Sequence, residues 1–249
     1  GSSNYILSKV FNEGADYATA LQEAQDKGFA ESDPGFDVDG LDALYKLVII
    51  ATHAFGTHVP PEQVFTYGIS GMRPEDIRYA QEKGRKIKLV GQLQKLDEHA
   101  FTLFVMPKLV PEEEYIYNVE EEYNGVVIDG EFYDKQFMFG KGAGAYPTGS
   151  AVLSDITARS HNYRYEYKKM RYFQPPTYNT EALLDIYLRF ENILDFSYFD
   201  FDVITEKFTG SNGYNYVRGQ IRLKNLLRIQ PLLNKLNVFM AFGAVSGKG

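Results

Sequence analysis

Up to about residue 84, apolar residues recur three and four positions apart, the spacing that places them on one face of a helix. This pattern predicts helices over residues 4–11, 16–27 and 40–55, and another from Pro74 to about Gly84. Asp39 is the expected N-cap of the third helix, because its short acidic side chain can accept a hydrogen bond from the first helical turn. Gly28 and Gly56 are the expected stops after the second and third helices.

After residue 85 the pattern changes to runs rich in β-branched and aromatic residues, which are typical of strands. The predicted strands cover residues 86–96, 100–109, 123–128, 131–139, 182–191, 198–208, 214–223 and 237–245. Asp129-Gly130 is the expected tight turn between the third and fourth strands. Helices are predicted over residues 148–159 and 226–236, although Pro231 is unfavourable inside the second of these.

These elements predict an α+β fold with a mixed or antiparallel sheet and helices on one face. The stretch YFQPPTYNTE, which contains two adjacent prolines, is expected to be a linker. We therefore expect one domain over residues 1–171, a linker over 172–180 and a second, smaller domain over 181–249.

Composition narrows the classes of protein to which the chain could belong. A formal net charge of −7 argues against nucleic-acid binding, which requires clustered Lys and Arg, and the short basic run at residues 168–172 is too small to change this. The absence of cysteine excludes a disulfide scaffold and fits a cytoplasmic location. No apolar run reaches ~18 residues, and the N-terminus has no signal-peptide pattern, so we expect no membrane partner.

Residues 31–50, ESDPGFDVDGLDALYKLVII, place five carboxylates before an almost wholly apolar run with a single lysine, Lys46. A calcium-binding loop is excluded: with Gly40 at the glycine position, the first and twelfth ligand positions fall on Gly35 and Lys46. Acidic residues at the positive end of a helix account for Asp39 but not for Lys46.

Lys46 has no obvious solvent-facing side in this pattern. Every other residue from 43 to 52 is apolar or small, and a helix that is apolar on all faces is usually buried. Asp42 lies one helical turn earlier, so the two side chains share a face. One interpretation is a purely structural lysine, either in a buried ion pair or with its apolar stem reaching water. The other is a lysine held by carboxylates at the mouth of a pocket, where it exchanges a proton with a substrate.

The motif E-x-D-P-x-x-D-x-x-G-L-D-x-x-x-K, at residues 31–46, resembles the substrate-site signature of the homoserine dehydrogenases. SSNYIL, at residues 2–7, resembles the segment that leads from the cofactor domain to the catalytic domain of that family. GKGAGAYPTGSAVLSDI, at residues 140–156, resembles the family's glycine-rich turn and the helix that follows it. The three stretches occur in the family's order, and the resemblance covers about residues 1–160.

The resemblance implies an oxidoreductase that interconverts L-homoserine and L-aspartate 4-semialdehyde with NAD or NADP, on the route to threonine and methionine. It implies that Lys46 contacts the reacting oxygen and takes part in the proton transfer, with Asp42 orienting the lysine. Asp37 would share the hydroxyl site, Glu31 would pair with the substrate ammonium group, and Ser2 would also bind substrate. We expect Lys46, placed between acids, to act as a proton donor in the reducing direction.

The resemblance also implies a nicotinamide-binding Rossmann domain, and no strand followed by G-x-G-x-x-G lies near the start of this chain. We therefore expect a C-terminal catalytic and dimerisation portion that is inactive alone and holds no cofactor. G-K-G-A-G-A, at residues 140–145, is a weak dinucleotide fingerprint, but no parallel strand follows to complete a βαβ unit. Gly142 and Gly144 are expected to line the cofactor cleft from its far side, and the helix at 148–160 to dock on the cofactor domain.

The C-terminal part resembles an ACT domain, a βαββαβ module that binds amino acids in many homoserine dehydrogenases. Residues 183–192 resemble its first strand, and residues 216–245 its later strand, second helix and last strand. The expected Pro-Gly turn and first helix are absent, and residues 193–204 are predicted to enter a strand directly. We expect a degenerate ACT-like, ferredoxin-like domain with a structural role or a role in dimer contacts.

Two functional hypotheses follow. The first is the catalytic portion of a homoserine dehydrogenase that binds a small-molecule substrate and forms a homodimer through its sheet. The alternative is a stand-alone amino-acid-binding regulatory module without redox chemistry. No metal site is expected, because the spacing of His53 and His58 does not place them on one helical face and no third ligand stands beside them.

Overall fold

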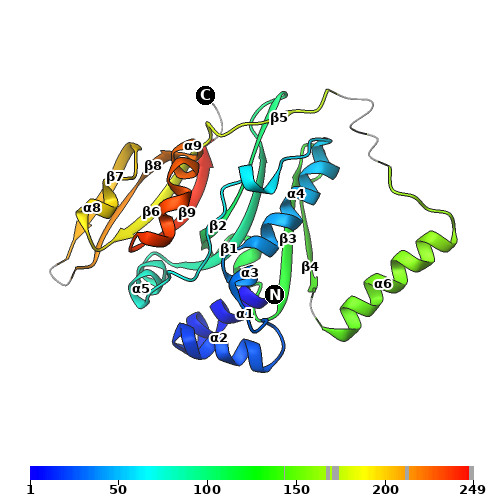
Figure 1. The fold of residues 1–249 in the computed structure, drawn as a ribbon, viewed down its shortest axis with the longest axis horizontal. Coiled ribbons are helices and arrows are strands. Elements are labelled where there is room, and N and C mark those ends of the chain that lie inside the picture. The colour runs from blue at the N-terminus through cyan, green and yellow to red at the C-terminus, as the bar shows by residue number, and fades with distance from the viewer. Residues whose placement is uncertain (143, 167–168, 170–173, 211–212, 247–249) are drawn as a thin grey trace. The chain divides into compact units, whose positions relative to one another are not determined.

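The computed structural model (Figure 1) describes residues 1–249 with the exception of 143, 167–168, 170–173, 211–212 and 247–249. The chain forms two compact units. Unit 1 consists of Gly1–Pro34 and Val110–Tyr167, and unit 2 consists of Gly35–Leu109 and Lys168–Gly249. Among the described residues, no helix is both long enough and apolar enough to span a membrane.

Unit 1 begins with short helices and ends with a hairpin and a long helix. Its elements are α1 (Ser2–Ser8), the π-helix η1 (Lys9–Glu13), α2 (Tyr17–Asp26), the 3₁₀ helix η3 (Tyr115–Asn118), β3 (Tyr123–Gly130), β4 (Asp134–Lys141) and α6 (Ala145–Ser160). The side-chain amide of Asn4 donates to the carbonyl oxygens of Val119, Glu121 and Tyr123 at 3.0–3.1 Å. Because Asn4 lies on α1, these bonds attach that helix to the start of the hairpin.

The first two predicted helices are confirmed in unit 1. Asp16 is the N-cap of α2, and its carboxylate accepts from the backbone N–H of Thr19 at 3.0 Å. Gly28, just beyond the helix, adopts a φ of 71°, which glycine reaches without steric cost. The helix predicted from residue 148 begins earlier, at Ala145, and none of its residues is buried.

The hairpin turn lies later than the sequence predicted. Gly130 still pairs with Asp134, so residues 131–133 form the turn in place of Asp129-Gly130. The positive φ of the turn, 61°, falls on Asp134, a residue type that tolerates this conformation. Gly130 is required for a different reason: a Cβ there would lie 2.2 Å from the ring of Tyr133.

In its described residues, unit 2 contains three α-helices and one 3₁₀ helix, η2, before its first strand, and a mixed sheet that continues toward the C-terminus. Its elements are α3 (Gly35–Val38), α4 (Leu41–Phe55), η2 (Pro61–Gln63), α5 (Pro74–Glu82), β1 (Arg85–Lys95), β2 (Ala100–Pro111), β5 (Thr177–Tyr178), β6 (Leu183–Phe190), α8 (Ile193–Phe196), β7 (Phe201–Thr209), β8 (Asn215–Arg222), α9 (Leu223–Ile229), η4 (Gln230–Lys235) and β9 (Val238–Ser246). The predicted helix at 226–236 is thus α9 followed by a 3₁₀ segment that contains Pro231. The change falls there because proline supplies no N–H for an α-helical bond.

The strands of unit 2 form one seven-stranded sheet in the order β1-β2-β9-β6-β8-β7, with β5 paired to β2 (Figure 1). Strand β2 runs parallel to β5 and β9, whereas β6 is antiparallel to both β8 and β9. Strand β7, at one end, pairs with β8 through two register shifts, at Phe201/Val203 and at Ile204/Glu206. The mixed sheet that the sequence predicted is therefore confirmed.

The grouping into units differs from the predicted division at residues 172–180. Strands from both sides of that segment share one sheet, because β9 pairs with β2 at Lys108 and Phe242 as well as with β6. Part of the predicted linker, residues 172–173, lies outside the described residues, and within the remainder Thr177 and Tyr178 form β5. In this grouping residues on both sides of the segment belong to unit 2, and the predicted division into domains stays a prediction.

One detail of the sequence prediction for the C-terminal part differs from the structure. Their order is β9-β6-β8-β7, with α8 between β6 and β7 and α9 between β8 and β9. The prediction that residues 193–204 enter a strand directly was wrong, because α8 forms one helical turn there. The side chain of Asn192 caps this turn by accepting from the N–H of Leu194 at 2.9 Å.

Alternation along β6 separates two faces of the sheet. Leu184, Ile186 and Leu188 are fully buried in a core that also contains Leu226 and Leu233, which lie on α9 and η4. Burial of each such side chain contributes about 1.5–3 kcal/mol, so this face accounts for much of the stability of unit 2. A second core lies between α4 and β2 and comprises Leu44, Leu47, Val48, Ala51, Val59, Val64, Phe101, Leu103 and Val105.

The other face of β6 is polar and is covered by α5. Tyr187 stacks on Tyr79 of α5, with ring centroids 4.1 Å apart. Arg189 is only 2% exposed, and its Nε lies 3.0 Å from both carboxylate oxygens of Asp76, which is fully buried. Tyr187 donates to the same carboxylate at 2.9 Å, and the backbone N–H of Arg73 donates at 2.8 Å.

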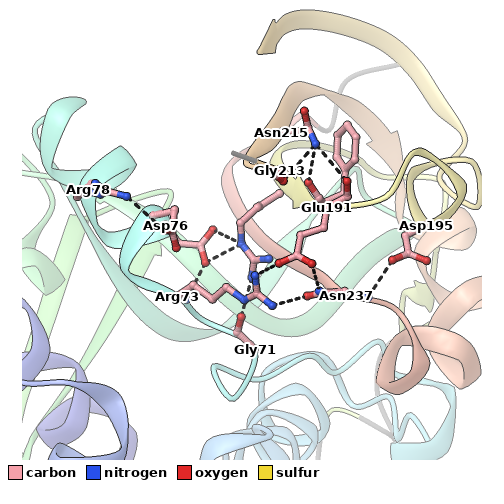
Figure 2. A network of polar contacts seen from close by, with 12 residues as sticks. Gly71, Arg73, Asp76, Arg78, Glu191, Asp195, Gly213, Asn215 and Asn237 are labelled. Atoms are coloured by element: carbon pink, nitrogen blue, oxygen red, sulfur yellow. Dashed lines mark hydrogen bonds and ion pairs between the residues drawn. The ribbon is translucent and has the colours of Figure 1, made fainter. Parts of the chain in front are cut away.

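A polar network extends from this ion pair to the ends of β6 and β9 (Figure 2). Nη2 of Arg189 donates to the carbonyl oxygen of Gly71 at 2.8 Å. Arg73 forms an ion pair with Glu191 and donates to Asn237 at 2.9 Å. Burial raises the pKa of Asp76 to about 6, although Arg189 opposes this by favouring the carboxylate.

Replacing Arg189 with methionine should lower the free energy of unfolding by about 3–5 kcal/mol, because the carboxylate of Asp76 would stay buried without its cation. Urea denaturation monitored by circular dichroism measures this loss. Arg228→Met is the matched control: its pair with Asp200 is exposed, so its loss should cost less than about 1 kcal/mol. Equal losses for both variants would contradict the stabilising role assigned to the buried pair.

Candidate functional site

The acidic motif of residues 31–46 is shaped by a left-handed glycine between two helices. Gly40 joins α3 to α4 with a φ of 85°, and a Cβ there would lie 3.0 Å from Val105. Gly40 is also the N-cap of α4, and no side chain caps that helix, so the prediction that Asp39 is the cap was wrong. The turn needs a residue that tolerates positive φ at the capping position, and Asp39 accepts a hydrogen bond from the hydroxyl of Ser70 at 3.0 Å instead.

Helix α4 has one buried face and one exposed face, although both are rich in apolar residues. Leu44, Leu47 and Val48 pack into the core, whereas Tyr45 and Ile49 are exposed. The prediction that this helix is buried on all sides, leaving Lys46 without a solvent side, was therefore wrong. Hydrophobic periodicity could not show this, because apolar side chains occupy both faces.

Lys46 and Asp42 form the predicted pair on the exposed face of α4. Nζ of Lys46 lies 2.6 Å from Oδ2 of Asp42, and the two side chains are 66% and 43% exposed. The interpretation of a buried ion pair is excluded by this exposure. The ammonium group is held by a carboxylate and is open to solvent, so it can donate a hydrogen bond or a proton to an oxygen of a bound molecule.

The ion pair lies on a helix face that also carries exposed apolar side chains. The rings of Phe36 and Tyr45 stack 5.8 Å apart and link α3 to α4. Leu41, Ile49 and Ile50 are also at least 38% exposed. Asp37, on α3, is half-exposed. The arrangement offers charged donors and acceptors beside apolar surface, which suits a small polar molecule with a short carbon chain.

Glu31 and Ser2 belong to unit 1, where hydrogen bonds hold the backbone near both residues. The hydroxyl of Ser2 donates to the carbonyl oxygen of Phe29 at 2.5 Å. The side chain of Gln25 donates to the backbone carbonyl of Glu31 at 2.9 Å, whereas the Glu31 residue itself is exposed. These bonds fix the loop that carries Glu31 and leave its carboxylate at the surface. Within unit 2, the predicted site residues Asp42 and Lys46 are in direct contact with one another.

Gly142 and Gly144 lie between β4 and α6 and are needed by the local backbone. A Cβ on Gly142 would lie 2.6 Å from the side-chain nitrogen of Asn124, and Gly144 has a φ of 108°. The preceding strands, β3 and β4, form a separate antiparallel pair, so this turn does not open a βαβ unit. No described residue in the first turn of α6 is buried, and the cofactor contact of Gly142 and Gly144 stays a prediction.

The sequence patterns did not predict a cluster of polar and charged side chains that lies in unit 1. Glu23 accepts hydrogen bonds from Lys27 and from the hydroxyl of Tyr5, each at 2.7 Å. These bonds lower the pKa of Glu23 to about 2. The four-residue spacing of Glu23 and Lys27 on one helix was the available signal for their pairing. Lys27 also donates to the hydroxyl of Tyr5 at 2.7 Å, so the cluster joins α2 to α1.

No group of three or more His, Cys, Asp or Glu side chains arranged to hold a metal ion occurs among the described residues.

A sequence model of one family, described as homoserine dehydrogenase, matches residues 1–157. The homoserine dehydrogenase of Neisseria gonorrhoeae is 41% identical over 156 residues, which make up 63% of this chain and 36% of that protein. The chain therefore spans little more than a third of the length of this curated relative.

Two solved structures extend the likeness to the fold. A homoserine dehydrogenase from Thiobacillus denitrificans is similar over 98% of this chain and 62% of its own, with 29% identity and a TM-score of 0.72. A hyperthermophilic archaeal homoserine dehydrogenase, solved as a mutant in complex with NADPH, is similar over 66% of this chain and 46% of its own. Its identity is 30% and its TM-score is 0.53.

Replacing Gly40 with alanine should lower the free energy of unfolding by about 1–3 kcal/mol, because an L side chain is strained at this positive φ. The new methyl group would also crowd Val105. Thermal unfolding measures the loss. Gly149→Ala is the control, because Gly149 lies within α6 with open space around it, so alanine there should stabilise the chain or leave it unchanged. A neutral Gly40→Ala variant would contradict the assigned constraint.

Proposed function

Because the chain belongs to the homoserine dehydrogenase family, we propose that it carries the substrate-binding and proton-transfer residues of an enzyme that interconverts L-homoserine and L-aspartate 4-semialdehyde with NAD or NADP. The observation that carries this proposal is the Lys46–Asp42 pair at 2.6 Å, held on the exposed face of α4 within the region that the family model matches. The chain covers 36% of the N. gonorrhoeae relative, so the complete reaction is proposed for a longer protein.

In this proposal Lys46 handles the proton that moves to or from the reacting oxygen. The nicotinamide, when bound, supplies or accepts the hydride at the neighbouring carbon. In the reducing direction, the ammonium group of Lys46 donates its proton to the oxygen of the aldehyde as the carbonyl becomes an alcohol. The carboxylate of Asp42 keeps the ammonium group in place, because their contact at 2.6 Å restricts the rotamers of the long lysine side chain.

Because Lys46 is exposed, a role in proton transfer and a role in stabilising the fold predict different effects of its removal. An exposed ion pair one helical turn apart contributes only about 0.3–0.5 kcal/mol. Loss of the Lys46 side chain should therefore leave the fold intact, and any large loss of activity would have to come from the chemistry.

We assign substrate recognition to Glu31, Asp37 and Ser2. The exposed carboxylate of Glu31 suits the ammonium group of an amino-acid substrate, and Asp37 suits its hydroxyl. The hydroxyl of Ser2 already donates to Phe29, so Ser2 would act mainly by holding the loop that carries Glu31. The substrate proposed for this set is a small amino alcohol or the corresponding aldehyde.

We propose that the cofactor contacts the turn at Gly142 and Gly144 while a separate dinucleotide-binding domain holds most of it. The backbone at these glycines carries no side chain that would obstruct a ligand, and no described residue of α6 is buried. These features support both the cofactor contact and the docking of α6 on a partner domain.

For the C-terminal part we propose an ACT-like domain with a structural role, and for the whole a homodimer in the cytoplasm. The strand order β9-β6-β8-β7 with two intervening helical segments supports the first, since it corresponds to a βαββαβ arrangement. The exposed apolar side chains of the β3–β4 hairpin, such as Phe137 and Phe139, support an interface there. The absence of cysteine supports the location.

Lys46→Ala should lower the rate of the chemical step by about 10²-fold or more, a typical contribution of general acid–base catalysis. The measurement is single-turnover oxidation of homoserine in a chain that also carries a dinucleotide-binding domain. Lys207→Ala, which removes an exposed lysine on β7, should keep full activity. Normal turnover by the Lys46 variant, with unchanged unfolding, would remove this residue from the mechanism.

Glu31→Gln should weaken homoserine binding by about tenfold or more, because the substrate ammonium group would lose its charged acceptor. Isothermal titration calorimetry measures this affinity directly, with Glu113→Gln as a control that removes an exposed carboxylate outside the proposed site. Equal affinities for both variants would show that Glu31 does not contact the substrate.

A further inference from the structure

A second set of convergent polar side chains lies in unit 2, on elements other than α3 and α4. The residues enclose a cavity of about 120 Å³ between the end of α5 and the sheet. Its polar lining consists of three cations, one carboxylate and two tyrosines, namely Lys83, Arg85, Arg218, Asp185, Tyr79 and Tyr187. The cavity is smaller than the about 300–1,000 Å³ of pockets for drug-sized ligands, so only a small molecule or ion would fit.

Positive charge exceeds negative charge in this lining. Arg218 is paired with Asp185 at 2.7 Å, and Lys83 lies 3.4 Å from Glu206, which is not one of the lining residues. Arg85 donates through Nη1 to the carbonyl oxygen of Leu109 at 3.1 Å, and within the described part of the chain it has no carboxylate partner. An uncompensated guanidinium group beside a cavity attracts anions, and its fixed planar geometry suits two oxygens at once.

Tyr79 provides an independent indication of a ligand. Its side chain is 3% exposed, and its buried hydroxyl has no hydrogen-bond partner among the described residues. A buried hydroxyl without a partner is costly, which is why such groups are usually paired with protein, water or ligand. Burial raises the pKa of Tyr79 to about 12, so the hydroxyl keeps its proton at neutral pH and can donate it in a hydrogen bond.

We propose that this cavity binds a small oxyanion, a carboxylate or a phosphate, with Arg85 as the principal contact and Lys83, Arg218 and the Tyr79 hydroxyl as further donors. Asp185 holds Arg218 in place. The proposal does not rest on the dehydrogenase function, because none of these residues belongs to the site on α4. Tyr187 also lines the cavity, but its hydroxyl proton is already donated to Asp76, so Tyr187 is not counted among the donors to the anion.

The test is calorimetric titration of the 249-residue chain at low ionic strength with two separate probes, inorganic phosphate and succinate. We expect saturable binding of at least one probe with one site per chain and a higher melting temperature in its presence. Binding of phosphate alone or of succinate alone identifies the preferred chemistry, and either result supports the site. Arg85→Gln should weaken binding by about tenfold or more, the scale of a hydrogen bond to a charged group.

Arg228→Gln is the matched control, because it removes the same charge from an exposed position on α9. It should leave the affinity within about twofold of the original, as expected for a screened charge at the surface. Tyr79→Phe provides a second test that removes one oxygen atom and should weaken binding by about threefold or more, whether or not Arg85→Gln folds. The proposal is overturned by the absence of saturable binding of both probes, by equal effects of the two arginine variants, or by unchanged affinity in Tyr79→Phe.

Discussion

The buried contact between Asp76 and Arg189 is the constraint on which unit 2 depends. Transfer of a guanidinium group from water into the interior costs several kcal/mol, and only a well-placed carboxylate offsets that cost. Arg189 lies on β6 and Asp76 on α5, which are separated by more than a hundred residues of sequence. Any arrangement that removed α5 from the polar face of β6 would leave each of these charges without its oppositely charged partner. The contact therefore fixes how the C-terminal strands lie against the helices that precede β1.

Hydrogen bonds to one short segment, residues 69–71, connect the Asp76–Arg189 contact to the turn between α3 and α4. Arg189 donates to the carbonyl oxygen of Gly71, and two residues earlier the N–H of Ile69 donates to the carbonyl oxygen of Val38 at 2.8 Å. Val38 is the last residue of α3, directly before the turn that leads to Asp42 and Lys46. The Asp42–Lys46 pair at the surface thereby follows a turn whose backbone bonds to a segment that the interior holds in place, so a side chain can be open to solvent without being poorly positioned.

Local chemistry explains which features could be predicted from the sequence. Helix ends at Gly28 and Gly56 and the pairing of Asp42 with Lys46 depend on residues at most a few positions apart, and the structure confirms them. The exposure of Lys46 depends on what packs against α4, which residue types within the helix do not reveal. The burial of Asp76 is similar: in the sequence it is an acidic residue in a first helical turn, and only the distant β6 makes it an interior group.

The two register shifts in β7 have a consequence for how concentrated solutions of this protein behave. An edge strand with unpaired N–H and C=O groups is a template on which another chain can add a strand. Strand β7 is such an edge strand, and it exposes Val203, Ile204 and Phe208. The shifts at 201/203 and 204/206 interrupt the even spacing of those groups and increase the local twist. A flat incoming strand would find few groups in line, so the irregularity protects an apolar edge against self-association.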